Sequence, residues 1–500
     1  MRGFLVLLAV VIATSASPAI ADESHAHGAP VGVAAFGSPP VLWGMVSLAA
    51  ILALFAAARA LLARSAVGAG AGGEQGVLAA VRSFSTNARL FLTYSLFSEL
   101  GSGIWTVLFN LYLLRLDFTI AFIGLFWLVN MVCHGVASLP IGLLADRFGR
   151  RQAFFAATAL SVVAQGGVLL TQNWVAILVL GGIAGIGQAA HGVTGAPFMM
   201  ENSEPRERSH LFSLNAGFLQ ISRFGGNLAG GLIPLIWAAT LGVPEISPNA
   251  VRWALVTGLP MTVGAALPLL FMRERRTPFT GSFSDLVLLK NVVNMQVVVR
   301  LTLLSLVFGT AFGLTIRFFN IFFETAHDAS DGQIGAILAL GALGGVGTIF
   351  LSPVIGRRYG KAGGILLTQG ASVPLLMLMA VVPSLSFVTF LFLARSAVYS
   401  LAMPLREQLN MEFITARERG TTAGFTHMAF DLGGGAGAIL AGLLITGSGF
   451  LPTFSVAALL VLLPAVFYYR YFAPLERGRP APSAPVTAPA AAQQPAGGMS

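Results

Sequence analysis

The chain has 500 residues, of which 56% are apolar and only 10% charged, with a mean hydropathy of +0.80 and a formal net charge of +9. Soluble domains carry about 25% charged residues, so this composition excludes a soluble enzyme and a disordered scaffold, and the lone cysteine, Cys133, excludes a disulfide-stapled secreted module. The basic residues lie in short loops between apolar stretches, which indicates orientation in a membrane rather than nucleic-acid binding.

The N-terminus has the pattern of a secretory signal. A basic start, a short apolar run and an A-x-A site predict a signal peptide at 1–21, with an uncleaved signal anchor as the alternative. The polar segment 22–40 is expected to be an exposed leader, because His25 and His27 alone are too few ligands for a metal site.

An apolar stretch follows the leader. Residues 41–63 are long enough to cross about 30 Å of hydrocarbon and predict an extra N-terminal transmembrane helix. The Gly/Ala-rich segment after it predicts a cytoplasmic linker over 64–88.

Twelve further apolar runs lie on either side of a basic, polar stretch, six before it and six after it. They are 90–114, 121–145, 152–171, 174–199, 210–238, 251–272, 297–323, 332–356, 362–382, 385–410, 421–446 and 450–472. We therefore expect an all-α membrane protein of two six-helix bundles, 89–272 and 297–473, joined by a central cytoplasmic loop at 273–296. The Pro/Ala-rich tail at 474–500 is expected to be disordered.

Basic residues collect in alternate loops. One set of loops contains Arg147, Arg150, Arg151, Arg206, Arg208, the 273–290 cluster, Arg357, Arg358, Lys361, Arg417, Arg419 and the start of the tail. The opposite loops are neutral or acidic apart from Arg115 and Arg252 at span ends. This asymmetry predicts that the basic loops and the C-terminus are cytoplasmic and that the leader lies outside an inner membrane.

One register relates the two halves. Residues 211 positions apart match at Arg89 and Arg300, Gly124 and Gly335, Arg147 and Arg358, Gly149 and Gly360, Glu201 and Glu412, and Gly231 and Gly442. The second half is therefore interpreted as a copy of the first. Such repeats are related by an axis along the membrane normal and meet at a midplane cavity.

The loop after the second run carries a motif. It reads GLLADRFGRR from Gly142 to Arg151, and its repeat copy reads GRRYGK from Gly356 to Lys361. The first resembles the G-x-x-x-D-R-x-G-R-R signature of the major facilitator superfamily, and the second resembles its degenerate partner. The resemblance covers about residues 85–473. It implies a twelve-helix secondary transporter whose spans 1, 4, 7 and 10 line the cavity.

This motif loop is expected to act in gating. Asp146 can pair with arginines or with a helix N-terminus, and Gly142 and Gly149 permit close helix approach and a tight turn. Such a latch would hold one access state and break in the other, whereas topology anchoring alone is the alternative. The predicted gating residues are Gly142, Asp146, Arg147, Gly149, Arg150, Arg151, Arg358 and Gly360.

Polar side chains within the spans predict the substrate site. An ionisable residue there costs at least ~2.5–3.5 kcal/mol and by default faces a cavity or a partner. The predicted substrate or coupling cavity contains Glu99, Asn110, Gln188, His191, Arg223, Arg317, Asn320, Arg395, Tyr399, His427 and Asp431. Most of these residues lie on the spans that the family resemblance assigns to the cavity.

Two carboxylates are candidates for proton coupling. Asp431 lies one helical turn from His427, and this pair could relay a proton, while desolvation could raise the pKa of Asp431 or of Glu99. The alternative is a buried structural ion pair of either carboxylate with Arg395 or Arg223.

The balance of deep charges bears on the solute. Three arginines face two carboxylates, at Arg223, Arg317, Arg395, Glu99 and Asp431. One excess positive charge favours an anionic or zwitterionic solute. His134, in the second span, is interpreted as structural.

Several motifs are absent from the sequence. It has no phosphate-binding P-loop, no metal-site spacing and no catalytic nucleophile motif, so we expect neither an enzyme nor a cofactor. The prediction is a monomeric secondary transporter of a small organic solute, working by alternating access with protons, its direction left open. A transporter-like sensor or partner-binding subunit without transport is the alternative.

Overall fold

The computed structural model describes residues 84–204, 207–273, 294–415 and 418–477. The regular structure within these ranges is entirely helical. The predicted signal peptide, leader, extra helix 41–63, and most of the linker, central loop and tail lie outside the described residues. We call residues 84–273 the N-half and residues 294–477 the C-half.

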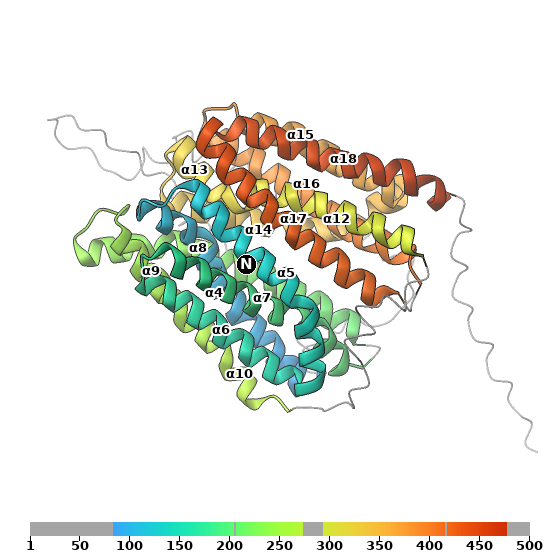
Figure 1. The fold of residues 1–500 in the computed structure, drawn as a ribbon, viewed down its shortest axis with the longest axis horizontal. Helices are drawn as coiled ribbons and strands as arrows, with labels where there is room; N and C mark the ends of the chain where they lie inside the picture. Colours follow the sequence, from blue (N-terminus) through green and yellow to red (C-terminus); the bar gives the residue numbers. More distant parts are fainter. Residues whose placement is uncertain (1–83, 205–206, 274–293, 416–417, 478–500) are drawn as a thin grey trace, which may run out of the picture.

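Each half is an ordered series of helices (Figure 1). The N-half contains α4 (Thr86–Arg115), α5 (Ile120–Phe148), α6 (Arg150–Leu170), α7 (Trp174–Glu201), α8 (Arg208–Leu241), α9 (Pro248–Gly264) and α10 (Ala266–Phe271). The C-half contains α12 (Met295–Thr315), the 3₁₀ turn η2 (Ile316–Phe318), α13 (Phe319–His327), α14 (Asp331–Tyr359), α15 (Lys361–Met379), α16 (Leu385–Glu412), α17 (Arg419–Ser448) and α18 (Phe450–Arg477).

The predicted apolar runs coincide with these helices except for a few residues at run ends, the sixth run lying over α9 and α10 and the seventh over α12, η2 and α13. Ten helical segments of the described chain are long and apolar enough to cross a membrane. Helices α4 and α14 are not among the ten. Large apolar side chains on the outer surface, such as Leu170, Ile236 and Leu443, remain exposed, as expected of a surface that faces lipid.

Local sequence sets where the helices begin. The side chains of Ser85, Thr119, Asn173, Ser247 and Asn294 each accept a backbone N–H in the first turn of the following helix. Such caps satisfy N–H groups that have no partner within the helix. The helices therefore begin at capping residues that the sequence places just before the apolar runs.

Two glycines terminate α5 and α14. Gly149 has φ of 111° and Gly360 has φ of 74°, a region that residues with a Cβ rarely adopt. The predicted role of Gly149 in a tight turn agrees with this geometry. Because the two glycines are matched in the sequence repeat, both halves turn at the same position.

The halves contact each other most extensively through two pairs of helices, α5 with α17 and α8 with α14. A Cβ on Gly124 would lie 3.2 Å from Cα of Gly442, and a Cβ on Gly335 would lie 2.6 Å from Cα of Gly231. Backbones approach this closely only where no side chain intervenes. The repeat matches Gly124 with Gly335 and Gly231 with Gly442, so the two crossings are equivalent.

Among the described residues, the large buried apolar cluster that joins the halves lies at one end. The largest cluster includes Leu111 and Ile123 of the N-half together with Phe318 and Phe323 of the C-half. We call this the Arg115 end and the opposite one the Asp146 end. At the Asp146 end the buried clusters are separate, one around Phe154 in the N-half and one around Leu405 in the C-half.

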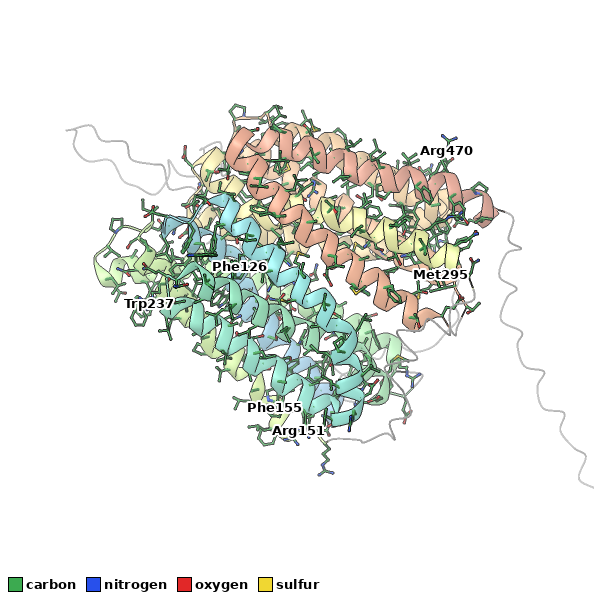
Figure 2. All side chains as sticks on the ribbon, viewed as in Figure 1. Phe126, Arg151, Phe155, Trp237, Met295 and Arg470 are labelled. Carbon is green, nitrogen blue, oxygen red and sulfur yellow. The ribbon has the colours of Figure 1, made fainter. Side chains whose placement is uncertain are left out.

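The views agree with this distribution. The ribbons of the two halves lie together near α13 and diverge toward the end where α10 and α18 terminate (Figure 1). In Figure 2, Arg151 and Phe155 of the N-half and Met295 and Arg470 of the C-half lie on the diverging parts of the two bundles. The halves are therefore packed together at the Arg115 end and apart at the Asp146 end.

Helix packing in the C-half leads to a stability prediction. A methyl group at Gly313 of α12 would overlap the carbonyl oxygen of Gly434 in α17. We expect Gly313→Ala to destabilise the protein by about 1–3 kcal/mol through overpacking, seen as a lower melting temperature in detergent. Gly370→Ala is the matched control, because nothing lies within 4 Å of a Cβ at that position. Equal melting temperatures for the two variants would contradict the packing described here.

Candidate functional site

An ion cluster closes the Arg115 end. The guanidinium of Arg115 in α4 contacts Asp331 of α14 at 2.6 Å and Glu324 of α13 at 2.9 Å. The side chain of Asp331 is fully buried and that of Arg115 is 9% exposed. Breaking a buried pair leaves an uncompensated charge, which is strongly destabilising. The cluster therefore holds the halves together at this end.

Two asparagines join the halves about one helical turn further into the protein than the Arg115 cluster. Asn110 of α4 donates to the side-chain oxygen of Asn320 in α13 at 3.1 Å and to the carbonyl of Arg317 at 2.5 Å. Asn320 donates back to the carbonyl of Val107 at 2.9 Å, and Trp127 donates to Asn110 at 2.9 Å. Both asparagines were predicted as cavity residues, and they lie together where the first spans of the two halves meet.

The motif loop makes its contacts within the N-half. Arg150 pairs with Asp146 at 2.9 Å and with Glu201 at 2.7 Å. The side chain of Asp146 is 45% exposed, and Arg147 lies over the ring of Phe148. The arginine with which Asp146 pairs therefore belongs to its own half.

The remaining gating residues are placed as follows. Arg151 donates to the carbonyl of Leu270 at 3.2 Å, and the exposed Arg358 lies over the ring of Tyr359. Gly360 lies beside the carboxylate of Glu476. The expectation that Gly142 allows close helix approach is wrong for this conformation, because nothing lies within 4 Å of where its Cβ would be. The halves diverge at this end, so no helix of the C-half reaches it.

Equivalent ion pairs close the corresponding loops. Arg150 pairs with Glu201 at 2.7 Å in the N-half, and Lys361 pairs with Glu412 at 2.6 Å in the C-half. Both residues of the second pair lie 211 positions after those of the first. The predicted repeat is therefore accompanied by repeated contacts.

A carboxylate and a guanidinium pair halfway along α4 and α8. Glu99 and Arg223 are 2.6 Å apart, with side chains 12% and 52% exposed. An arginine half exposed in the middle of a spanning helix adjoins space that is not filled by protein. Of the ion pairs considered from the sequence for Glu99, the one with Arg223 forms.

The second deep carboxylate pairs across the halves. Asp431 of α17 lies 2.7 Å from Nδ1 of His134 in α5, beside the close approach of Gly135 to Asp431. His427 is exposed, and its predicted pairing with Asp431 is not formed. The structural interpretation of His134 missed this contact. Its sequence signal is an ionisable side chain within an apolar span, next to a glycine.

Two arginines of the C-half rest on aromatic rings. Arg317 lies 4.0 Å from the ring centre of Trp127. Arg395 is 1% exposed and lies over Phe319 and Tyr399. The Nε atoms of both are buried without a hydrogen-bond partner in the described chain. Cation–π contact stabilises these charges without neutralising them, so the region keeps a positive charge.

The remaining predicted residues of span 4 separate into two environments. The hydroxyl of Tyr94 lies 2.8 Å from Nδ1 of His191, and His191 also packs against Phe154. Gln188 is exposed and lines a pocket in the N-half together with Gln165. His191 therefore belongs to the helix packing, whereas Gln188 faces open space. Gln165, which lies within span 3, was missed by the sequence analysis.

One further carboxyl adjoins the ion cluster. Glu245 lies in the loop between α8 and α9, and its Oε1 is buried without a partner in the described residues. Burial and the nearby Asp331 raise the pKa of Glu245, while Arg115 opposes them. Glu245 is therefore protonated at a higher pH than an exposed glutamate.

Comparisons with known proteins relate this arrangement to a family. The Major Facilitator Superfamily model matches residues 90–438 and 326–497. No functionally curated protein is similar enough in sequence to match the chain.

Solved transporters share the fold. An inward-facing, unoccupied bacterial homolog of the human lysosomal transporter Spinster is 13% identical with a TM-score of 0.65, covering 82% of this chain and 100% of its own. A mutant of the nucleoside transporter NupG is 14% identical with a TM-score of 0.64, covering 77% and 99%. The D-xylose-proton symporter is 14% identical with a TM-score of 0.60, covering 76% and 96%.

The raised pKa of Glu245 predicts a pH effect. Ionisation of a carboxyl with a raised pKa opposes the folded state, so its stabilising contribution is present at low pH and lost as the pH rises through the folded pKa. We expect Glu245→Gln to melt at a higher temperature than the unmodified protein at pH 7.5. The difference should shrink by pH 5, and a difference that grows on acidification would contradict the environment described.

The Arg115 cluster predicts a change in access. Arg115→Gln leaves Asp331 buried without its cation, a loss of about 3–5 kcal/mol, and should favour a conformation open at this end. The measurement is labelling of Gln188→Cys, in a Cys133→Ser background, by an impermeant maleimide added on the side that Arg115 faces. We expect labelling to become about tenfold faster.

The control replaces an arginine at the same end. Arg252 is exposed, and Arg252→Gln should leave the labelling rate unchanged. An unchanged rate in Arg115→Gln, or equal acceleration in both variants, would show that the cluster does not close this end.

Proposed function

Because the chain belongs to the Major Facilitator Superfamily, it transports a solute across a membrane, and we propose that this solute is a small organic anion or zwitterion moved together with protons. The chain works by alternating access in this proposal. The observation that carries it is the Glu99–Arg223 ion pair. In this pair the carboxylate of Glu99 binds the half-exposed guanidinium of Arg223, which lies midway along α8.

Competition for Arg223 links the proton to the solute. While Glu99 is ionised, it neutralises Arg223 at 2.6 Å, so a solute carboxylate must displace it. Protonation of Glu99 removes that competitor and frees the guanidinium, which binds carboxylates in a bidentate fashion. An anion then binds best when a proton is bound, so both move in the same direction. Arg317 and Arg395, which lack a carboxylate partner in the described chain, favour the same charge of solute.

The Asp431–His134 pair is a second contact that contains a titratable group. Unlike Glu99–Arg223, it joins the two halves. Its atoms are 2.7 Å apart and belong to α17 and α5, which must shift against each other when access alternates. An imidazole changes charge near neutral pH. Proton uptake or release at this pair would therefore alter the attraction between the halves.

The conformation fits one state of the cycle. With the basic loops in the cytoplasm, the Arg115 end faces outside and is closed, and the Asp146 end faces the cytoplasm. In the opposite state the Arg115 cluster opens, and the loop of Asp146, Arg147 and Arg150 contacts the C-half as a latch. We propose that the chain performs this cycle as a monomer in the inner membrane.

The coupling role of Glu99 is tested in proteoliposomes. Glu99→Gln cannot exchange a proton, so solute accumulation driven by a pH gradient should be lost, while exchange of labelled for unlabelled solute continues. The solute is first chosen by thermal shift from panels of organic anions, zwitterions, cations and sugars, because a ligand of the folded state raises its melting temperature.

The matched control is an exposed glutamate elsewhere on a spanning helix. Glu407 of α16 is exposed, and Glu407→Gln should keep both driven accumulation and exchange. Driven accumulation that survives in Glu99→Gln would remove Glu99 from the coupling role.

A further inference from the structure

A pocket lies inside the N-half between α4, α5, α6 and α7. It is lined by Ser102, Trp105, Thr106, Phe109, Phe126, Trp127, Asn130, Ala164, Gln165, Val168, Leu180, Ala184 and Gln188. Its volume of about 110 Å³ is of the same order as the engineered cavity of about 150 Å³ that binds benzene. The pocket is therefore large enough for a single ring.

The walls of the pocket are aromatic. Phe109 and Phe126 have ring centres 4.7 Å apart, and Trp127 meets both nearly edge-on. Trp105 lies next to Phe109 with a centroid separation of 5.7 Å. Such surfaces favour a planar ring, because offset and edge-to-face contacts between aromatic groups add to the burial of apolar area.

Polar groups on the lining are available to a ligand. Asn130 is 1% exposed, and its side-chain oxygen has no hydrogen-bond partner in the described chain. The side-chain oxygen of Gln165 accepts a hydrogen bond from Thr262 at 3.1 Å. The side-chain amide nitrogen of Gln165 is then available to donate a hydrogen bond to a ligand. Gln188 and Thr106 are exposed on the lining. Buried polar atoms are normally paired, so the lone oxygen of Asn130 indicates a missing donor.

A cation from the other half stacks on Trp127, one of the residues that line the pocket. Arg317 stacks 4.0 Å from the ring centre of Trp127, and its Nε has no partner in the described residues. It lies in η2, where the seventh span is interrupted between α12 and α13. Interrupted spanning helices are tolerated where they line a cavity, and substrate sites are found there.

We propose that this pocket binds the ring of a monocyclic aromatic or heteroaromatic carboxylate, whose carboxylate is held by Arg317 while Glu99 still pairs with Arg223, as in this conformation. The assignment rests on the proposed transport of an organic anion and specifies its chemical class. The ring packs among Phe109, Phe126 and Trp127. A ring nitrogen accepts a hydrogen bond from the amide nitrogen of Gln165, and a ring hydroxyl donates one to the side-chain oxygen of Asn130. Since the ring contacts the N-half and the carboxylate contacts the C-half, the bound solute bridges the two.

Equilibrium binding to the purified full-length protein tests this assignment without a membrane or a gradient. The probes are benzoate and nicotinate, followed by tryptophan fluorescence and calorimetry. Benzamide supplies the ring without the charge, and cyclohexanecarboxylate supplies the charge without the aromatic ring. We expect benzoate or nicotinate to bind about tenfold more tightly than either comparator. Binding of neither probe, or equal binding of a comparator, overturns the assignment.

Two variants localise the ligand. Arg317→Gln should weaken binding of the better probe about tenfold and leave benzamide unchanged. Arg300→Gln is its control, because Arg300 lies on the same span, stacked on Tyr471 outside the pocket. Thr106→Leu fills the pocket from an exposed position and should abolish binding while preserving the fold. Unchanged binding in Thr106→Leu would show that the ring lies elsewhere.

Flux measurements separate this assignment from the transport proposal. If the bound probe is not accumulated under a proton gradient, the coupling proposal fails and the pocket stands. If the probe is accumulated equally by Arg317→Gln and Thr106→Leu, the pocket assignment fails and proton-driven transport stands.

Discussion

A charge inside hydrocarbon is costly unless a partner or water reaches it, and this constraint organises the polar structure of the chain. Arg115 lies against Asp331, Glu99 against Arg223, and Asp431 against His134. Arg317 and Arg395 form no ion pair with a carboxylate of the described chain and rest on aromatic rings instead. The few charges that the sequence retains within its spans therefore mark the contacts on which helix and domain placement depend.

The three pairs join different parts of the molecule. The Arg115 cluster links the two halves at their closed end, and Glu99–Arg223 lies wholly within the N-half. Asp431–His134 joins the halves between α17 and α5. Carboxylates are therefore paired both within one half and between the halves, while the closed end is held by a guanidinium that stays charged at physiological pH.

The sequence predicted the all-helical membrane fold, because apolar runs are local properties of the chain. It did not predict charge partners, because these depend on how helices cross. Asp431 and His134 are 297 positions apart, and no local pattern distinguishes that pair from the nearer His427. The aromatic pocket was missed for the same reason: Gln165 and Trp127 gain a shared environment only when α5 and α6 pack together.

The two glycine crossings have a mechanical consequence. At Gly124 with Gly442 and at Gly231 with Gly335, backbone rests on backbone with no side chains to interlock. Where side chains of one helix fill the grooves of another, they must separate before the helices can move against each other. Helices that meet backbone to backbone have no such side chains to separate. The two crossings thus act as paired fulcrums, because a tilt of one half about the line through them would leave no side chains to repack at these two contacts.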